Sequence, residues 1–242
     1  MDKTNKINMN LSIIIPSYNE LENLQVLLPQ LKTELINTKI NYEILIIDTV
    51  EGCEKTREIC STYINIRYIN RLPTNTYGDA VRTGINKCNG DFLIFMDADG
   101  SHTPSFVKTL YEERHNADIV IASRYVDGGK TENGFILIFM SFVVNKLYSL
   151  VLNLNVKDVS NSFKLYKSSY LKNLILKCTN FDIVEEILYN CKVNYPTIKI
   201  LEIPYIFKKR MYGQTKRNLI IFIFTFTLTL IKLRFTKKSI KW

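Results

Sequence analysis

The chain has 242 residues, of which 46% are apolar and 23% charged, and its net charge is +9. This composition excludes a disordered chain, which would hold far fewer apolar residues, and a collagen-like chain, which would need far more than nine glycines. Residues 208–242 hold ten Lys and Arg and no acidic residue, so the rest of the chain has a net charge of −1. This distribution argues against a uniformly basic nucleic-acid binder and favours a localised anionic partner.

From residue 11 onward, apolar β-branched runs alternate with helical patterns. The sequence predicts strands at 11–16, 42–47, 66–69, 92–96 and 118–122, and helices at 24–35, 53–63, 80–88 and 104–116. Such alternation predicts an α/β fold with a mostly parallel central sheet and helices on both faces. Ligands of these folds bind at the carboxyl ends of the strands.

Two apolar segments follow this region, Phe135–Val144 and Leu219–Ile231. Thirteen helical residues reach about 20 Å, short of the roughly 30 Å hydrocarbon core of a bilayer, so neither segment is a comfortable transmembrane helix. The basic flanks of the second segment favour an interfacial helix on anionic lipid. For Phe135–Val144, a buried core helix is an equally good interpretation.

The five cysteines form no CxxC pair, and the two histidines, His102 and His115, are distant from them in sequence. This pattern indicates reduced thiols, with neither a disulfide framework nor a zinc site. Residues 1–10 are polar and contain no apolar signal core, so we expect no secretory signal and a catalytic face on the cytoplasmic side of a membrane.

Two aspartates, Asp97 and Asp99, follow the predicted fourth strand. Residues i and i+2 of an extended segment point the same way, so both carboxylates can hold one divalent cation. The alternative is a turn in which Ser101–Thr103 caps the helix that begins at Pro104. Like charges at the end of a buried strand need a counter-ion, which favours the metal site.

The first strand ends in Pro16-Ser-Tyr-Asn-Glu20, without glycine. A dinucleotide-binding fingerprint needs glycines at this position, and no P-loop motif occurs elsewhere, so both classes are disfavoured. A nucleoside can instead stack near Tyr18 and hydrogen-bond to Glu20 and Asp48. Asn19 as a helix cap is compatible with the same interpretation.

In their order along the chain, the motifs resemble those of dolichol-phosphate mannosyltransferases, which are inverting family-2 glycosyltransferases of GT-A fold. The resemblance runs from about Leu11 to Lys216, and it rests on several separate motifs: Pro16–Glu20, Asp48, Tyr77–Ala80 with Gly84, Asp97–Asp99, Ser123–Tyr125, Asp158–Tyr166 and Arg210–Lys216. So many ordered motifs are improbable by chance.

This resemblance implies transfer of a sugar from a nucleotide diphosphate sugar, with GDP-mannose the first choice, to a polyprenyl or dolichyl phosphate. It implies Mg²⁺ or Mn²⁺ as cofactor, held by Asp97 and Asp99 with Ser101 at a third position. The implied donor contacts are Pro16, Tyr18, Glu20, Asp48, Asp79, Asp97, Ala98, Asp99, Arg124, Arg210 and Lys216, and among them Asp99, Arg124 and Arg210 are the implied catalytic residues.

Charge then dictates the expected mechanism. An acceptor phosphate is already anionic at neutral pH, so attack on the anomeric carbon needs no strong general base. The enzyme must position two anions and stabilise the leaving diphosphate, tasks for the cations Arg124, Arg210 and Lys216. A single displacement predicts inversion of the anomeric configuration.

The chain departs from the family pattern at several positions. Asp48-Thr49 replaces paired aspartates, Asp79 stands where a small residue is common, Lys164 replaces an arginine, and Phe142 stands where a basic residue often faces lipid headgroups. Glu186 matches an acidic family position, and it either orients a sugar hydroxyl or an arginine or is a solvated helix carboxylate.

We therefore expect a GT-A domain at residues 1–216 with a membrane-facing helix near 135–152, and a basic, apolar membrane-associating tail at 217–242. One alternative is a family-2 transferase that acts on a soluble glycan or protein. The other is a non-catalytic adaptor that uses the basic tail to bind a membrane or nucleic acid.

Overall fold

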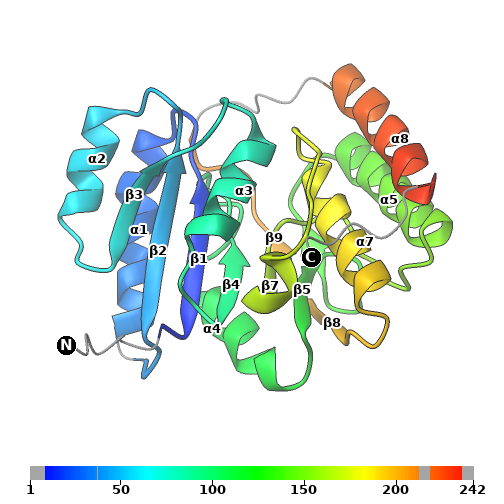
Figure 1. Ribbon diagram of the computed structural model, residues 1–242, viewed down its shortest axis with the longest axis horizontal. Helices are drawn as coiled ribbons and strands as arrows, with labels where there is room; N and C mark the ends of the chain where they lie inside the picture. Colours follow the sequence, from blue (N-terminus) through cyan, green and yellow to red (C-terminus); the bar gives the residue numbers. More distant parts are fainter. Residues whose placement is uncertain (1–8, 37, 213–218, 236–242) are drawn as a thin grey trace.

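The computed structural model describes residues 9–36, 38–212 and 219–235, with the side chains of the last helix described from residue 225 onward. A seven-stranded sheet with the order β3-β2-β1-β4-β7-β5-β8 forms the centre of the molecule (Figure 1). Its strands are β1 (Leu11–Pro16), β2 (Tyr42–Asp48), β3 (Ile66–Asn70), β4 (Phe92–Phe95), β5 (Ile119–Ser123), β7 (Lys164–Lys167) and β8 (Ile200–Pro204). A separate parallel pair joins β6 (Lys130–Thr131) to β9 (Ile206–Phe207).

Helices cover both faces of this sheet. They are α1 (Leu21–Ile36), α2 (Glu54–Ser61), α3 (Tyr77–Lys87), α4 (Ser105–Glu112) with the 3₁₀ turn η1 (Glu113–His115), α5 (Phe135–Val151), α6 (Ser168–Leu171), α7 (Ile183–Asn194) and α8 (Leu219–Phe235). Successive residues of a strand point to opposite faces. Ile13 and Ile15 of β1 accordingly pack with α1, α2 and α4, whereas Ile14 packs with α3, α6 and α7.

These observations confirm the predicted α/β class and the five predicted strands. The strands β7 and β8 were not predicted. The strand β7 is antiparallel to both of its neighbours, β4 and β5, while every other pairing in the sheet is parallel. It belongs to the segment after Asp158, and its insertion separates β4 from β5. The carboxyl ends of β2, β1, β4 and β5 still share one edge of the sheet, because these four strands run in the same direction.

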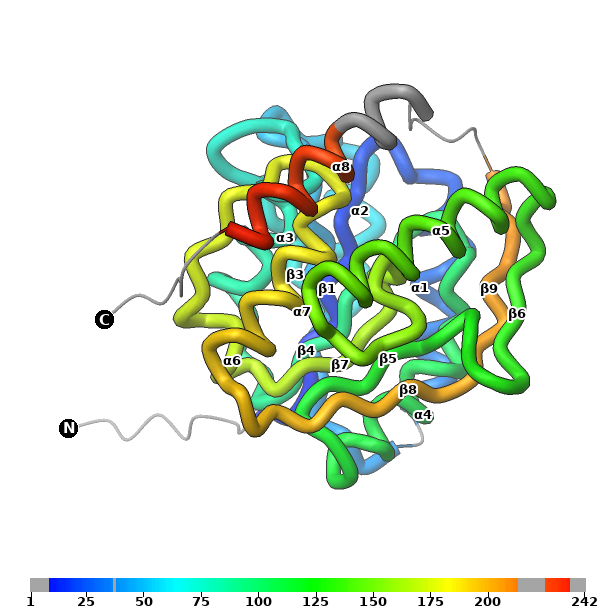
Figure 2. Tube along the Cα trace, turned by 90° about the vertical axis from the view of Figure 1, so that its right-hand side faces the viewer, coloured from blue at the N-terminus to red at the C-terminus, as the bar shows by residue number. Residues whose placement is uncertain are grey.

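The helices α5 and α8 lie side by side at the end of the molecule opposite α2 (Figure 1), and the tube view shows them as neighbouring outer segments (Figure 2). The hydroxyl of Tyr148 joins them by donating to the carbonyl of Phe226 at 2.6 Å. Between residues 9 and 235, as far as the structure describes them, no helix has the length and hydropathy needed to cross a bilayer.

Candidate functional site

The carboxyl edge of the sheet brings together most of the residues predicted for donor binding. Pro16 ends β1 and residues 17–20 follow it, Asp48 ends β2, Asp97 and Asp99 follow β4, and Arg124 follows β5. Because these strands are parallel, their ends converge although their sequence positions span more than a hundred residues.

Arg210 bridges two carboxylates at this edge. Its Nη2 lies 3.2 Å from Oδ2 of Asp99, and its Nη1 donates to both Glu20 oxygens at 3.1 Å. The neighbouring backbone is fixed as well, because the amide of Met211 donates to the carbonyl of Asp99 at 2.9 Å. The structure therefore brings Glu20, Asp99 and Arg210 into one site, as the sequence predicted.

Two serines, Ser101 and Ser162, hold the aspartates of the loop after β4 by hydrogen bonds. Ser101 donates its amide and its hydroxyl to Oδ1 of Asp99 at 3.0 and 2.6 Å, so its side chain orients this carboxylate. Ser162 donates to Oδ1 of Asp97 at 3.2 Å. Both aspartates keep part of their side chains exposed at the edge of the sheet, at 27% and 18%.

His102, which was not predicted as a site residue, contacts the backbone of the loop that carries Asp97 and Asp99. Its ring is fully buried and stacked on Phe163, and its Nδ1 accepts the amide of Asp97 at 2.9 Å. Since Nδ1 is an acceptor, Nε2 carries the hydrogen and donates to Oδ1 of Asn161 at 3.2 Å. Burial lowers the pKa of His102, which keeps the ring neutral.

The donor set at Asp97 and Asp99 fits a hard divalent cation. Both residues offer carboxylate oxygens, the ligands that Mg²⁺ and Mn²⁺ prefer, and Asp99 already faces the positive charge of Arg210. No group of three or more His, Cys, Asp or Glu residues suited to a metal occurs in the described part of the chain. Two protein carboxylates therefore leave coordination positions for ligand oxygens.

The predicted nucleoside end of the site combines an exposed ring with buried carboxylates. Tyr18 is 44% exposed, whereas Asp48 is buried and accepts from the Tyr68 hydroxyl and the Thr49 amide, both at 2.8 Å. Pro16 closes β1 beside these residues, and the side chain of Ala98 lies in the core, so Ala98 can offer only its backbone.

Arg71 supports this end of the site, and sequence reasoning missed it. Its buried guanidinium donates to the carbonyls of Ser17, Ile47 and Asp48, and so ties the end of β1 to the end of β2. Burial lowers the pKa of Arg71, although the nearby carboxylates oppose this effect. The only sequence signal was a lone arginine directly after β3.

The carboxylate of Asp79 is hydrogen-bonded to residues at and just before the first turns of its own helix, α3. It accepts hydrogen bonds from Arg82 at 2.8 Å, from the Thr76 hydroxyl at 2.7 Å and from Thr74. Burial raises the pKa of Asp79, but these hydrogen bonds outweigh burial and lower it to about 2. The predicted base or sugar contact by Asp79 thus competes with three internal partners.

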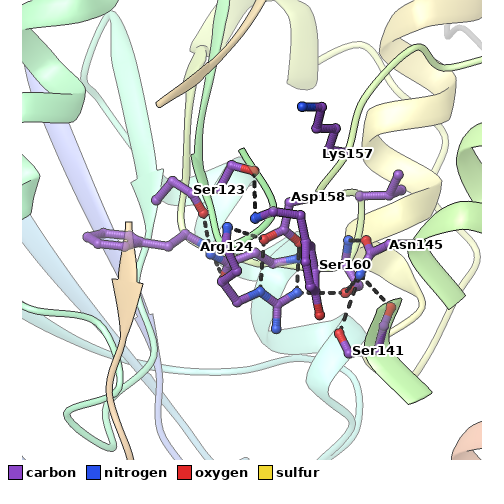
Figure 3. Close-up of polar contacts among 12 residues, drawn as sticks. Ser123, Arg124, Ser141, Asn145, Lys157, Asp158 and Ser160 are labelled. Carbon is purple, nitrogen blue, oxygen red and sulfur yellow. Dashed lines mark hydrogen bonds and ion pairs between the residues drawn. The ribbon is translucent and has the colours of Figure 1, made fainter. Parts of the chain in front are cut away.

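Arg124 forms a buried ion pair with Asp158 (Figure 3). Its Nε and Nη2 donate to the two Asp158 oxygens at 2.8 and 2.7 Å, and Nη2 also donates to Ser160 Oγ at 2.9 Å. Burial would lower the pKa of Arg124, but the charge of Asp158 raises it. Only Nη1 makes no hydrogen bond to a residue that the structure describes. One guanidinium nitrogen is therefore left for a substrate.

Glu186 and Lys164, two further residues that the sequence comparison with the family pointed to, are both buried. Glu186, on α7, accepts the amides of Lys177 and Cys178 at 2.8 and 2.9 Å, and so holds a loop in place. Lys164 is fully buried and donates to the carbonyls of Val159 and Asn161, and burial lowers its pKa to about 8. Lys216, the remaining predicted phosphate contact, lies outside the described residues.

Comparison with known proteins places this geometry in context. The sequence profile of glycosyl transferase family 2 matches residues 12–175. A dolichol-phosphate mannosyltransferase of Pyrococcus furiosus is 33% identical over 215 residues, which cover 86% of this chain and 59% of that protein. An undecaprenyl-phosphate mannosyltransferase of Micrococcus luteus is 29% identical, with coverage of 87% and 88%. The chain thus spans less than two thirds of the first relative's length.

Solved structures with the same fold include glucosyl-3-phosphoglycerate synthase of Mycobacterium tuberculosis. Its complex with Mn²⁺, UDP-glucose and glycerol 3-phosphate superposes with a TM-score of 0.70 at 14% identity, over 93% of this chain and 80% of that one. A complex of the same enzyme with Mg²⁺ and UDP gives a TM-score of 0.69. This likeness confirms the predicted GT-A fold.

Proposed function

Because the chain belongs to glycosyl transferase family 2, we propose that it transfers a hexose, with mannose first, from a nucleotide diphosphate sugar to a polyprenyl or dolichyl phosphate. The names of its relatives from P. furiosus and M. luteus, a dolichol-phosphate and an undecaprenyl-phosphate mannosyltransferase, support mannose as the sugar and a polyprenyl phosphate as the acceptor. The observation that carries the proposal is the position of Arg210 between Glu20 and Asp99, at the carboxyl edge of the sheet.

The donor would lie along this edge, with its nucleoside near Tyr18 and Asp48 and its diphosphate near Asp97 and Asp99. A divalent ion held by the two aspartates would neutralise diphosphate charge. The guanidinium of Arg210 is partly exposed and lies 3.2 Å from Asp99, beside the expected position of the diphosphate. When the donor binds, this guanidinium can therefore leave Asp99 and donate to phosphate oxygens instead. GDP-mannose is our first choice of donor.

The reaction needs positioning more than proton transfer. The acceptor phosphate attacks the anomeric carbon and the nucleoside diphosphate leaves from the opposite side, which inverts the configuration. Arg210 and the free Nη1 of Arg124 supply positive charge for the two anions. Asp158 and Ser160 fix the guanidinium of Arg124 before the substrates arrive, so little reorganisation accompanies the reaction.

The acceptor would come from a membrane surface that contacts α5 and α8. Large apolar side chains of both helices are exposed: Phe135, Ile136, Leu137, Phe139, Phe142, Val143, Leu147, Leu150 and Val151 on α5, and Leu228, Ile231 and Phe235 on α8. Such a contiguous apolar surface is typical of an interaction face. We propose peripheral attachment at the cytoplasmic face, with residues 1–216 as the catalytic domain and 217–242 as the membrane-associating tail.

A transfer assay tests the proposal. The purified chain is incubated with radiolabelled GDP-mannose or UDP-glucose, undecaprenyl phosphate and Mn²⁺ or Mg²⁺, and the products are extracted with butanol. We expect label in the butanol phase, and its loss in Asp99→Asn. Label found only in water-soluble glycan would establish a soluble acceptor instead. No transfer from either donor, under conditions in which the chain is folded, would contradict the proposal.

A further inference from the structure

The helix α5 has an inverted distribution of polarity. Asn145 and Tyr148 are its only buried residues, whereas Phe135 and Leu150 are at least 80% exposed. A helix on an ordinary soluble domain buries its apolar side chains and exposes its polar ones. Here the amide of Asn145 and the ring of Tyr148 attach the helix to the rest of the protein, and most of its apolar side chains face outward.

Asn145 is saturated with hydrogen bonds. Its Oδ1 accepts the Ser160 amide at 2.8 Å, and its Nδ2 donates to Ser160 Oγ at 3.0 Å and to the Ser141 carbonyl at 2.7 Å. The amide and the hydroxyl of Ser160 are therefore both fixed by one side chain of α5 (Figure 3). A primary amide suits this task, because it offers an acceptor and two donors.

The same Ser160 hydroxyl reaches the site. Its oxygen accepts from Nη2 of Arg124 at 2.9 Å, so a single hydroxyl oxygen contacts both Asn145 and the guanidinium. From there, Asp158 accepts the Asn161 amide at 3.2 Å, and Asn161 contacts His102 beneath Asp97. A displacement of α5 is thus transmitted to Arg124 through one intervening residue.

We infer that Asn145 is a positioning residue that couples the contact of α5 with lipid to the placement of Arg124, through the Ser160 hydroxyl. This inference rests on the proposed function. When the apolar side chains of α5 lie in lipid, they add a restraint on the helix, and Asn145 holds Ser160 and the guanidinium in the arrangement seen here. Without lipid, Asn145 and Tyr148 still attach α5, but its exposed apolar side chains add no restraint.

Hydrogen exchange of the full chain tests the coupling without relying on activity. Neutral phosphatidylcholine vesicles should slow amide exchange in peptides that cover residues 157–164 by about tenfold. In Asn145→Ala and in Ser160→Ala, the vesicles should still bind, as sedimentation measures, but that protection should shrink. Ser160→Ala is the sharper variant because it keeps the backbone hydrogen bond to Asn145 and deletes only the shared oxygen. Lys146→Ala, at the next and exposed position, should behave like the wild type.

Transfer kinetics give a second readout. We expect vesicles to raise the kcat of the wild type and of Lys146→Ala, and to raise that of Ser160→Ala far less, with the donor KM nearly unchanged. Equal protection of 157–164 in Ser160→Ala and the wild type would overturn the coupling, as would no protection in the wild type. Because exchange is measured without substrates, the coupling can be judged even if the transfer assay refutes the proposed function.

Discussion

At the scale of single residues, the site is a set of opposite charges held in place before any ligand arrives. Arg210 lies between Glu20 and Asp99, and Arg124 pairs with the buried Asp158. Pairing of this kind holds the guanidinium groups and the carboxylates in fixed orientations. The two arginines differ in freedom, because Arg210 is 25% exposed and Arg124 only 9%. We therefore expect Arg210 to change partners and Arg124 to stay.

This difference predicts the effect of Arg210→Ala. Loss of one cation that stabilises the leaving diphosphate should lower kcat about 10²-fold, a typical cost of removing one electrostatic donor. Steady-state transfer assays measure it. Lys209→Ala is the matched control, because Lys209 is adjacent and exposed, and it should stay within about twofold of the wild type. An equal loss in both variants would contradict the assigned role of Arg210.

The pKa of Asp79 predicts a defined acid dependence of stability. Its pKa of about 2 in the folded protein lies below the ordinary aspartate pKa of 3.8, so the native state favours the carboxylate. The stabilisation is fully present above pH 4 and is lost as the pH falls from about 4 to about 2. Urea unfolding should show Asp79→Asn less stable than the wild type at pH 7, with a gap that narrows toward pH 2. A gap that stays constant would show that charge is not the cause.

At the scale of elements, the alternation of strands and helices carried most of the predictable information. The ends of β1, β2, β4 and β5 were placed within two residues, which is why Glu20 and Asp99 were correctly brought together. The pairing of Arg124 with Asp158 and the insertion of β7 depend on contacts between distant segments. Local periodicity contains no information about such contacts, so the sequence alone could not predict them.

The packing of α3 on β1 gives an element-scale prediction. A Cβ added at Gly84 would lie 2.4 Å from Cγ2 of Ile14, which is too close for any relaxed contact. Gly84→Ala should therefore lower the free energy of unfolding by about 1–3 kcal/mol, as overpacked cores do. This loss would exceed the helix-propensity gain of alanine, about 1 kcal/mol. Urea denaturation tests it, with Gly134→Ala as control, since a Cβ there would meet nothing within 4 Å.

At the scale of the whole molecule, α5 and α8 both expose apolar side chains, but the basic charge lies with α8. The basic excess of the chain lies in residues 208–242, whereas α5 exposes nine large apolar side chains and carries a single lysine, Lys146. The exposed ring of Phe142 adds to the apolar surface of α5. Attachment through α5 should then depend on burial of apolar area, and attachment through the tail on the charge of the lipid.

This division predicts how vesicle binding responds to salt. On neutral vesicles, the apolar face of α5 should provide most of the affinity, so binding should persist when salt shortens the Debye length from about 10 Å at 0.1 M to about 3 Å at 1 M. Anionic lipid should add a component that the same salt removes. Phe139→Asp, on the exposed face, should weaken binding to both kinds of vesicle, whereas Arg234→Gln, at an exposed basic position of α8, should weaken only binding to anionic ones. Sedimentation measures each case, and complete release from neutral vesicles by salt would assign attachment to charge instead.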